Sequence, residues 1–427
     1  MLTGPDRLED RDNYLPLARS LAEGRGFAIG GRPTAYRPPL YPILLAPLVG
    51  TLPARWLPWG VGGLHLALGV GTVALVARTA RLWGLSPGRA CAAAAIAAFD
   101  PVLAVQARSI MTETPAAFLV AATLAGSALP GARGAILGGI GFGLSGLCRP
   151  SLLPAAGLAA LAGLTCGPGG PRARLARSTL LLAATAATLA PWAWRNAWAV
   201  GEPVWTTTHG GYTLALANNP AYYADVLDGP PGAVWSGPNQ DAWFAGVGRS
   251  TAGMTEPEAD RALRDSALRL ARDRPIAFLR ASIARVGRLW APAPSGAVYP
   301  AWLRAAAAAW TVPLWAALAV GLARPGLRRW PLVVAPSIAV ALTLVHLAYW
   351  TDLRMRAPLV PAVALIAAGA SLGGGRAGPA DPREEPGPVR RAAAAIRSRN
   401  DAGQATPKSR PKKGENSRFL AVQISGH

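Results

Sequence analysis

The chain alternates long apolar runs with shorter polar connections. Nine of the runs approach the roughly 20 residues that a helix needs to cross a membrane. They lie at Leu57–Ala77, Ala90–Val105, Thr114–Leu129, Ala135–Leu147, Ser151–Cys166, Ser178–Trp194, Ala301–Leu322, Pro331–Trp350 and Ala357–Leu372. The short fourth run either stands alone or merges with the fifth, and its glycines would allow close helix packing: Gly138, Gly139, Gly141 and Gly143. The pattern predicts an all-α polytopic membrane protein.

Arginine is distributed unevenly among the connections. Alternate connections, at residues 78–89, 130–134, 167–177 and 323–330, contain arginine and no acidic residue. Acidic residues occur instead before the first run, around Glu113, in the long loop Arg195–Pro300 and at Asp352. Because arginine-rich connections stay in the cytoplasm, the first set is expected inside and the second outside. We therefore expect a multi-pass protein of the cytoplasmic (inner) membrane, with its C-terminus in the cytoplasm and its active loops facing outward.

The composition argues against a soluble globular protein and against a nucleic-acid-binding protein. Of the 427 residues, 51% are hydrophobic and 15% are charged, whereas a soluble domain carries about 25% charged residues. The net charge of +21 is concentrated in the inner connections and in the C-terminal tail, so it indicates membrane topology and no nucleic-acid partner. Cys91, Cys148 and Cys166 lie in or beside apolar runs, without the spacing of a metal or disulfide set.

The N-terminus is unusual for this topology. Nine crossings and an internal C-terminus place Met1 outside, although Met1–Tyr14 is too polar to be an export signal. Either the first run exports the segment before it, or a preceding helix is missing, and we expect the second.

The predicted regions are an outward loop with an amphipathic surface helix (1–56), a transmembrane bundle (57–194), a long, partly helical outward loop (195–300), C-terminal transmembrane helices (301–372) and a disordered basic cytoplasmic tail (373–427).

The first outward loop contains the most concentrated polar chemistry. Residues Arg11–Gly24 have helical spacing of apolar side chains, which predicts an amphipathic helix at the membrane surface. Asp12 is expected to cap that helix, whereas Asp10 is expected to be functional. Successive prolines after Tyr36 and Arg37 are expected to hold the backbone extended and to fix the direction of both side chains.

Further candidates lie along the outer side. Glu113 follows a short outward connection. It is either a polar residue of the membrane interface without a functional role or a functional carboxylate at the mouth of a cavity. Arg354 and Arg356 lie at an outer edge, where arginine is disfavoured, so they either bind an anionic partner or extend to the interface. In the long loop, Glu256–Arg285 has the pattern of a pair of surface helices.

The order of motifs resembles that of the GT-C superfamily of integral-membrane glycosyltransferases. Within it, the chain is most similar to the glycosyltransferase-39, protein mannosyltransferase-like branch, which includes lipopolysaccharide-core and aminoarabinose transferases. The motifs, within residues 8–372, are Asp10-x-x-x-Tyr14-x-x-x-Ala18, Gly24-x-Gly26, Tyr36-Arg37-Pro38-Pro39-Leu40-Tyr41-Pro42, Thr112-Glu113, Pro191-Trp192-x-x-Arg195-Asn196, Asn218-Asn219-Pro220 and the edge formed by Tyr349, Arg354 and Pro358. The resemblance implies a GT-C-like bundle of about nine transmembrane helices from which the first family helix is missing.

The resemblance also implies a function and a site. It implies a cell-envelope transferase that moves a sugar from a polyprenyl-phosphate carrier to a lipid, glycan or protein acceptor on the outer face of the membrane. Asp10 and Glu113 would be the catalytic carboxylates. Metal dependence stays open, because Arg11 follows Asp10 where the family often has a second acid; Asp10 would hold any divalent cation. The donor phosphate would be bound by Arg37, Tyr36, Arg354 and Arg356, and the substrate-loop candidates are Tyr14, Arg195, Asn196, His209, Asn218 and Asn219.

These residue types suit that chemistry. Glycosyl transfer passes through a transition state that resembles an oxocarbenium ion, a carboxylate takes the proton of the acceptor, and arginine offsets the charge on the departing phosphate. Two alternatives stay open: a polytopic transporter or flippase, and a non-catalytic truncated relative. Transporters place polar groups near the middle of the bilayer, whereas the polar groups here lie in outer loops, which favours the enzyme.

Overall fold

The structure is a computed structural model that describes residues 10–230, 233, 235–295 and 299–370. This part of the chain is mostly helical, which confirms that the protein is helical as predicted. Its one sheet is a hairpin of β1 (Ala28–Ile29) and β2 (Arg32–Pro33), which are antiparallel. Gly30 and Gly31 make the turn with φ values of 57° and 76°, a region that glycine adopts without strain. Glu9 and the predicted tail at 373–427 lie outside the described residues.

All nine predicted apolar runs overlap helices of the structure. Eight of them overlap α3 (Leu57–Leu82), α6 (Glu113–Ser127), α7 (Gly131–Cys148), α8 (Pro154–Cys166), α9 (Pro171–Ala199), α15 (Ala301–Leu322), α16 (Val334–His346) and α17 (Val360–Ala370). The fourth and fifth runs stay separate, because the short 3₁₀ turn η1 (Pro150–Leu152) divides them.

The second run is broken into two helices, α4 (Pro87–Ala98) and α5 (Pro101–Gln106). The buried carboxylate of Asp100 accepts hydrogen bonds from the amides of Val102 and Leu103, each at 3.0 Å, so it caps the second helix. Pro101 cannot donate a hydrogen bond to the preceding turn, which explains why α4 ends here.

Within the described residues, two helices are long and apolar enough to cross a membrane: α3 and α15. In their most apolar stretches, only 22% and 17% of the residues are buried inside the structure. These helices suggest that the protein associates with a membrane. Crossing by all nine runs stays a prediction.

Glycines bring α7 close to its two neighbours. A Cβ atom on Gly141 would lie 2.9 Å from the Cα of Thr123 in α6. On the other side, a Cβ atom on Gly143 would lie 2.8 Å from the Cγ2 of Thr188 in α9. Since neither position has room for a methyl group, these glycines allow the close helix packing that was predicted.

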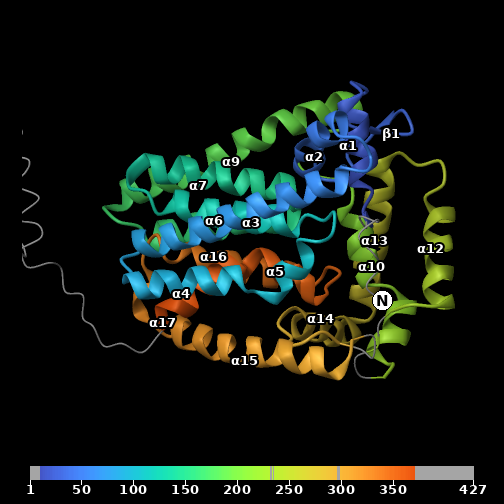
Figure 1. Cartoon of the computed structure of the whole chain (residues 1–427). Coiled ribbons are helices and arrows are strands. Elements are labelled where there is room, and N and C mark those ends of the chain that lie inside the picture. The colour runs from blue at the N-terminus through green and yellow to red at the C-terminus, as the bar shows by residue number, and fades with distance from the viewer. Residues whose placement is uncertain (1–9, 231–232, 234, 296–298, 371–427) are drawn as a thin grey trace, which may run out of the picture. The chain divides into compact units, whose positions relative to one another are not determined.

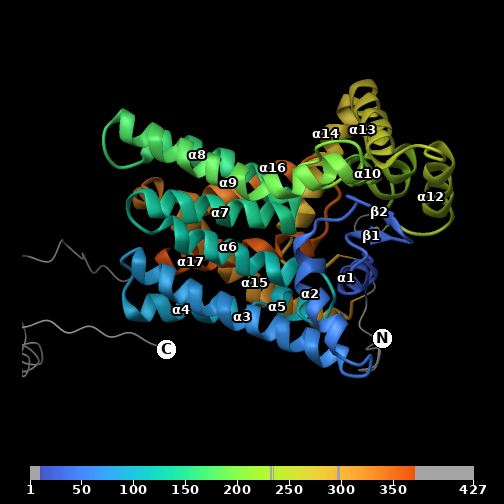
Figure 2. The ribbon, with the colours of Figure 1, turned by 90° about the horizontal axis from the view of Figure 1, so that it is seen from above.

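The segments predicted to lie outside gather at one end of the helix bundle (Figures 1 and 2). We call this end the loop end. The opposite end, which we call the arginine end, holds the arginine-containing connections of α3 with α4, α6 with α7 and α8 with α9 (Figure 1). The helices of the loop end are α1 (Tyr14–Ala22), α2 (Leu40–Thr51), α10 (Gly210–Ala217), α11 (Pro220–Tyr222), α12 (Pro238–Ser250), α13 (Glu256–Asp273) and α14 (Pro275–Leu289). Three short turns complete the order: η2 (Tyr223–Leu227), η3 (Pro325–Arg328) and η4 (Leu353–Leu359).

Two predictions for the loop end can be compared with the structure: the extended backbone after Arg37 and the pair of surface helices. The extended backbone expected at the prolines is not maintained: the chain bends at Tyr36 and Arg37, Pro39 already has a helical backbone, and Leu40 begins α2. Pro42 fits in the first turn of that helix, where the amide of the residue has no helical partner. The expected pair of surface helices is α13 and α14, of which α13 begins at Thr255 with a capping box.

Candidate functional site

Glu113 is a buried carboxylate at the loop end of the bundle, where it begins α6. Only 1% of its surface is exposed. Its Oε1 lies 2.9 Å from Nη1 of Arg149, at the end of α7, and 3.8 Å from Nη1 of Arg354, in η4. Neither carboxylate oxygen receives a hydrogen bond of good geometry from any described residue. Because a buried charge needs an opposite charge beside it, these ion pairs tie three distant segments together.

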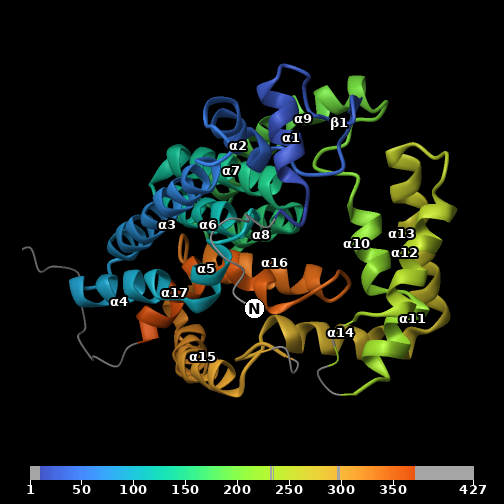
Figure 3. The same cartoon turned by 45° about the vertical axis from the view of Figure 1, so that its right-hand side comes forward.

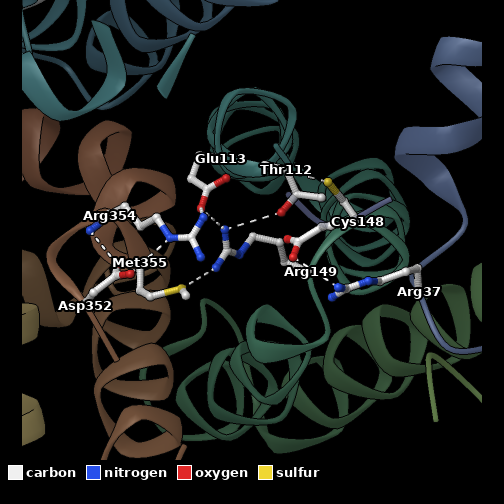
Figure 4. A network of polar contacts seen from close by, with 9 residues as sticks. Arg37, Thr112, Glu113, Cys148, Arg149, Asp352, Arg354 and Met355 are labelled. Atoms are coloured by element: carbon white, nitrogen blue, oxygen red, sulfur yellow. Dashed lines mark hydrogen bonds and ion pairs between the residues drawn. The ribbon is translucent and has the colours of Figure 1, made fainter. Parts of the chain in front are cut away.

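The two arginines have unequal partners (Figure 4). Arg354 donates from Nε to Oδ2 of Asp352 at 3.1 Å, a charge-assisted hydrogen bond. Arg149 donates from Nη1 to Oγ1 of Thr112 at 3.3 Å and from Nη2 to Sδ of Met355 at 2.7 Å. A thioether is a weak acceptor, so Arg149 directs one of its N–H groups at a partner that any oxygen anion would outcompete.

A second ion pair comes from the N-terminal segment. Nη2 of Arg37 lies 3.0 Å from Oδ1 of Asp12, and Nη1 lies 3.2 Å from Nε2 of His209. The guanidinium also lies over the rings of Tyr14 and Tyr36, at 5.9 Å and 5.4 Å from their centroids, in cation–π contact. Figure 4 shows the Arg37 side chain extending toward the side on which Arg149 lies.

Tyr14 links the two ion pairs electrostatically. Burial raises the pKa of its hydroxyl, the carboxylates of Asp12 and Glu113 raise it further, and the guanidinium groups of Arg37 and Arg149 lower it. All four charges therefore act on one side chain of α1. We name the whole set the arginine–carboxylate cluster: Asp12, Arg37, Glu113, Arg149, Asp352 and Arg354.

His209 lies beside this cluster, in contact with Arg37. Its ring stacks on Tyr212 with centroids 4.9 Å apart and meets Tyr36 edge-on at 4.4 Å. Burial lowers the pKa of His209 to about 3, and the nearby charge of Arg37 lowers it as well. The imidazole is therefore uncharged at physiological pH, and Nε2 accepts the hydrogen bond from Arg37.

Asp10 and Asp12 have the opposite arrangement to the one expected. The carboxylate of Asp10 accepts hydrogen bonds from the amides of Tyr14 at 2.9 Å and Leu15 at 2.8 Å, so Asp10 caps α1. Asn13, with a φ of 58°, forms the bend that places Asp10 over these amides. The capping role predicted for Asp12 therefore belongs to Asp10, and Asp12 is the first-loop carboxylate that contacts an arginine of the cluster.

Arg195 and Asn196 hold backbone together. Arg195 donates from Nη1 to the carbonyl of Thr34 and from Nη2 to that of Phe27, both at 2.6 Å. The fully buried Asn196 donates to the carbonyl of Val204 at 2.7 Å. These residues fasten the end of α9 to the segments that precede Tyr36 and His209, so their placement is that of positioning residues.

Asn218 and Asn219 organise the end of α10. Oδ1 of Asn218 accepts hydrogen bonds from Tyr223 at 3.0 Å and from Nη1 of Arg285 at 3.1 Å. Oδ1 of Asn219 accepts one from the amide of Tyr222 at 2.8 Å and so caps α11. Neither contact involves the arginine–carboxylate cluster.

Arg356 points away from the partners of Arg354. Its buried guanidinium donates to the backbone carbonyls of Leu289 and Ala291 and lies 5.0 Å from the ring centroid of Trp315. These contacts fasten η4 to the end of α14. The phosphate-binding role expected of Arg356 therefore has no support in its contacts.

Arg149 was not among the site residues predicted from the sequence. The signal for it was a single arginine in the outward connection between the fourth and fifth apolar runs, at the same predicted end as Glu113 and Asp352. Its partners come from residues 112, 113 and 355, so only the assembled fold shows that they meet.

The cluster does not have the donor set of a cation site. Among the described residues, no group of three or more His, Cys, Asp or Glu side chains is placed so that it could hold a metal ion. The backbone amides of α1 occupy both oxygens of Asp10, and guanidinium groups stand beside Glu113 where a cation would have to bind. These residues do not fit a divalent cation, and the positive charge at the site comes from arginine.

No protein-family model, curated protein or solved structure matches this chain.

Proposed function

We propose that this protein is a membrane glycosyltransferase that moves a sugar from a polyprenyl-phosphate carrier to a lipid, glycan or protein acceptor on the outer face of the cytoplasmic membrane. The observation that carries the proposal is Arg149, which is paired with the buried Glu113 and directs a further N–H at the sulfur of Met355. A phosphate oxygen is a far stronger acceptor than a thioether, and the planar guanidinium fork matches its geometry.

The membrane part of the proposal rests on α3 and α15. A core helix of a soluble protein is mostly buried, whereas most residues in the apolar stretches of these helices are not buried. Large exposed apolar surfaces are unfavourable in water and favourable in the hydrocarbon of a bilayer. The cluster lies at the loop end of the same bundle, which the arginine distribution assigns to the outer side.

The residues of the cluster suit the two halves of the reaction. The bond between the anomeric carbon and the carrier phosphate breaks, its electron pair leaves with the phosphate, and the same carbon forms a bond to an acceptor oxygen. Arg149, Arg354 and Arg37 would offset the charge that develops on the leaving phosphate. Asp12 would accept the proton of the acceptor, because it reaches the cluster while Asp10 caps α1. The role expected of Asp10 thus moves to Asp12.

The test compares conservative variants in proteoliposomes supplied with radiolabelled hexoses and pentoses on polyprenyl phosphate. Glu113→Gln is expected to lower transfer at least about 100-fold, because it releases both arginines from their positions. Asp12→Asn is expected to lower it about 10²–10⁴-fold as the loss of a general base, and Asp10→Asn considerably less. Glu202→Gln is the matched control, since Glu202 forms a half-exposed ion pair with Arg261 at the same end.

Thermal unfolding of each variant separates loss of activity from loss of fold. Undiminished transfer by Glu113→Gln would overturn the proposal, and a larger effect of Asp10→Asn than of Asp12→Asn would return the base role to Asp10. Movement of the carrier lipid across the bilayer without covalent transfer would instead support a transporter.

A further inference from the structure

Helix α14 exposes large apolar side chains on its outer side, whereas its buried side combines the apolar Ala281 and Leu289 with two polar residues. Ile276, Leu279 and Ile283 are 75%, 60% and 65% exposed and follow one another at helical spacing, so they form a single stripe. The two polar residues on the opposite side are Arg285, which is fully buried, and Ser282, which is buried. A surface helix of a soluble protein would turn such large apolar side chains toward the core and leave an arginine exposed.

The contacts of Arg285 fix this orientation. Its Nε and Nη2 donate to the carbonyl of Leu347 at 2.9 and 2.7 Å, and its Nη1 donates to the carbonyl of Ala217 at 2.8 Å and to Asn218 at 3.1 Å. Rotating α14 to bury the three apolar side chains would break these hydrogen bonds and leave their carbonyls unpaired, at substantial cost. The exposed stripe is therefore a fixed feature of the fold.

The stripe belongs to a helix that is joined to α15. The indole of Trp315 donates to the carbonyl of Trp290 at 3.0 Å, at the end of α14, and the two rings meet edge-on at 5.2 Å. Helix α15 itself exposes most of its apolar stretch, and Trp302 near its start is 71% exposed. Figure 3 shows α14 beside α15 and α16 at the loop end.

Exposed tryptophans also occur at the loop end of another helix. Trp194 and Trp198 lie in the last turns of α9 and are largely exposed. Tryptophan concentrates where the hydrocarbon of a bilayer meets its headgroups, and arginine beside an apolar stripe extends to lipid phosphates. Arg280 has that position on α14, next to Leu279, and is half-exposed in a pair with Asp228.

We infer that α14 lies in the outer interface of the membrane, with Ile276, Leu279 and Ile283 inserted among the lipids. The partner of this surface is the lipid leaflet. The helix would thereby set the depth of the loop end, because Arg285 fastens it to the end of α16 and Arg356 fastens it to η4, which carries Arg354. This inference rests on the membrane location in the proposed function and not on the proposed reaction.

The test uses spin labels in the full-length protein, reconstituted in vesicles of phosphatidylethanolamine and phosphatidylglycerol. Cys91→Ser and Cys166→Ser remove two of the three cysteines, and the remaining Cys148 is fully buried. A nitroxide is attached in Ile283→Cys and, as the matched control, in Ser250→Cys, an exposed polar position of α12. Power-saturation spectroscopy then measures collisions with molecular oxygen, which dissolves in lipid, and with a water-soluble nickel chelate.

At position 283, we expect high accessibility to oxygen and at least about tenfold lower accessibility to nickel than at position 250, because ionic chelates are excluded from hydrocarbon. Equal nickel accessibility at both positions would overturn the inference. Spin–spin broadening at position 283 that disappears on dilution with unlabelled protein would also overturn it, since a second copy would then cover the stripe.

The same measurement distinguishes this inference from the reaction. If position 283 is in lipid while Glu113→Gln retains full transfer, the proposed reaction fails and the lipid contact of α14 stands. If position 283 is in water while Glu113→Gln is inactive, the inference about α14 fails and the proposed reaction stands. A label in Leu279→Cys repeats the comparison at a second position of the stripe, in case one variant fails to fold.

Discussion

Arg149 contributes both charge and geometry to the cluster. Lysine in its place would keep the charge but lose the planar fork, so Arg149→Lys is expected to weaken binding of polyprenyl phosphate about tenfold or more. Arg149→Met is expected to cost about 3–5 kcal/mol of stability as well, because Glu113 would keep only the more distant Arg354. Native mass spectrometry and thermal unfolding measure the two effects.

The matched control for this prediction is Arg133→Lys at the arginine end, which is expected to change neither quantity. Unaltered lipid binding by Arg149→Lys would show that the site uses only the charge of the residue. Unaltered stability of Arg149→Met would show that Arg354 alone compensates Glu113.

His209 should make the protein sensitive to mild acid. The pKa of His209 is about 3 in the folded protein and about 6.5 in the unfolded chain. Between these values the unfolded chain binds the proton and the folded protein does not, so stability falls as pH falls from about 6.5 toward 3. In His209→Gln, the free energy of unfolding in detergent should therefore decrease less between pH 7.5 and pH 5 than in the unaltered protein. An identical decrease would mean that other groups cause the pH dependence.

Individual residues were only partly predictable from the sequence. Glu113 and Arg37 stood out, because a charge beside an apolar run or before two prolines is conspicuous. The exchange of roles between Asp10 and Asp12 was not predictable, because it depends on the bend at Asn13, whose φ is positive. The partners of Arg149 come from distant parts of the chain, and their meeting depends on how whole helices pack.

Helix α7 offers a direct test of close packing. A methyl group at Gly143 would lie 2.5 Å from the Cβ of Thr188, so Gly143→Ala is expected to destabilise the protein by about 1–3 kcal/mol. The control is Gly69→Ala in α3, where a methyl group meets no atom within 4 Å. That substitution should be neutral or should stabilise by up to about 1 kcal/mol, because alanine favours a helix more than glycine does.

Unfolding temperatures of the two variants in detergent measure this difference. Equal temperatures would show that α7 and α9 can move apart at little cost, contrary to the close contact of their backbones. Because neither glycine lies in the arginine–carboxylate cluster, lipid binding at the cluster can be measured alongside as an independent readout.

The positions of the helices along the chain were easier to predict than which side of each helix is buried. Apolar runs of sufficient length coincide with helices because hydrocarbon and protein interior both favour a backbone whose hydrogen bonds are internal. Helix α2 was missed, because Pro42 and Pro47 interrupt its apolar pattern although both fit within the helix. The orientation of α14 was not predictable, since the groups that bind Arg285 come from α10 and from the end of α16.

The orientation of the chain in the membrane is testable by labelling. In a background of Cys91→Ser and Cys166→Ser, a membrane-impermeant maleimide should label Asp241→Cys in intact cells, because α12 lies at the loop end. Arg172→Cys, at the arginine end, should react only after the membrane is permeabilised. The reverse order of reaction would invert the orientation, and simultaneous reaction of both in intact cells would contradict a sealed membrane between the two ends.

The separation of the two ends followed from charge alone. Apart from the connection that contains Arg149, connections with acidic residues alternate along the chain with connections that contain arginine and no acid, and antiparallel helices then bring each kind to its own end of the bundle (Figure 1). How the loop-end segments pack on one another did not follow, because the segment at residues 35–37 is joined to α13 and to the start of α10 by hydrogen bonds and an edge-on ring contact between residues far apart in the sequence.

The long reach of the cluster along the chain affects when it forms during synthesis. Arg37, Glu113 and Arg149 leave the ribosome early, whereas Asp352 and Arg354 follow only after α16. A nascent chain that already holds most of its helices still lacks one of the two arginines beside Glu113. The complete cluster therefore exists only once translation has passed η4, so an unfinished chain would not carry out the proposed transfer.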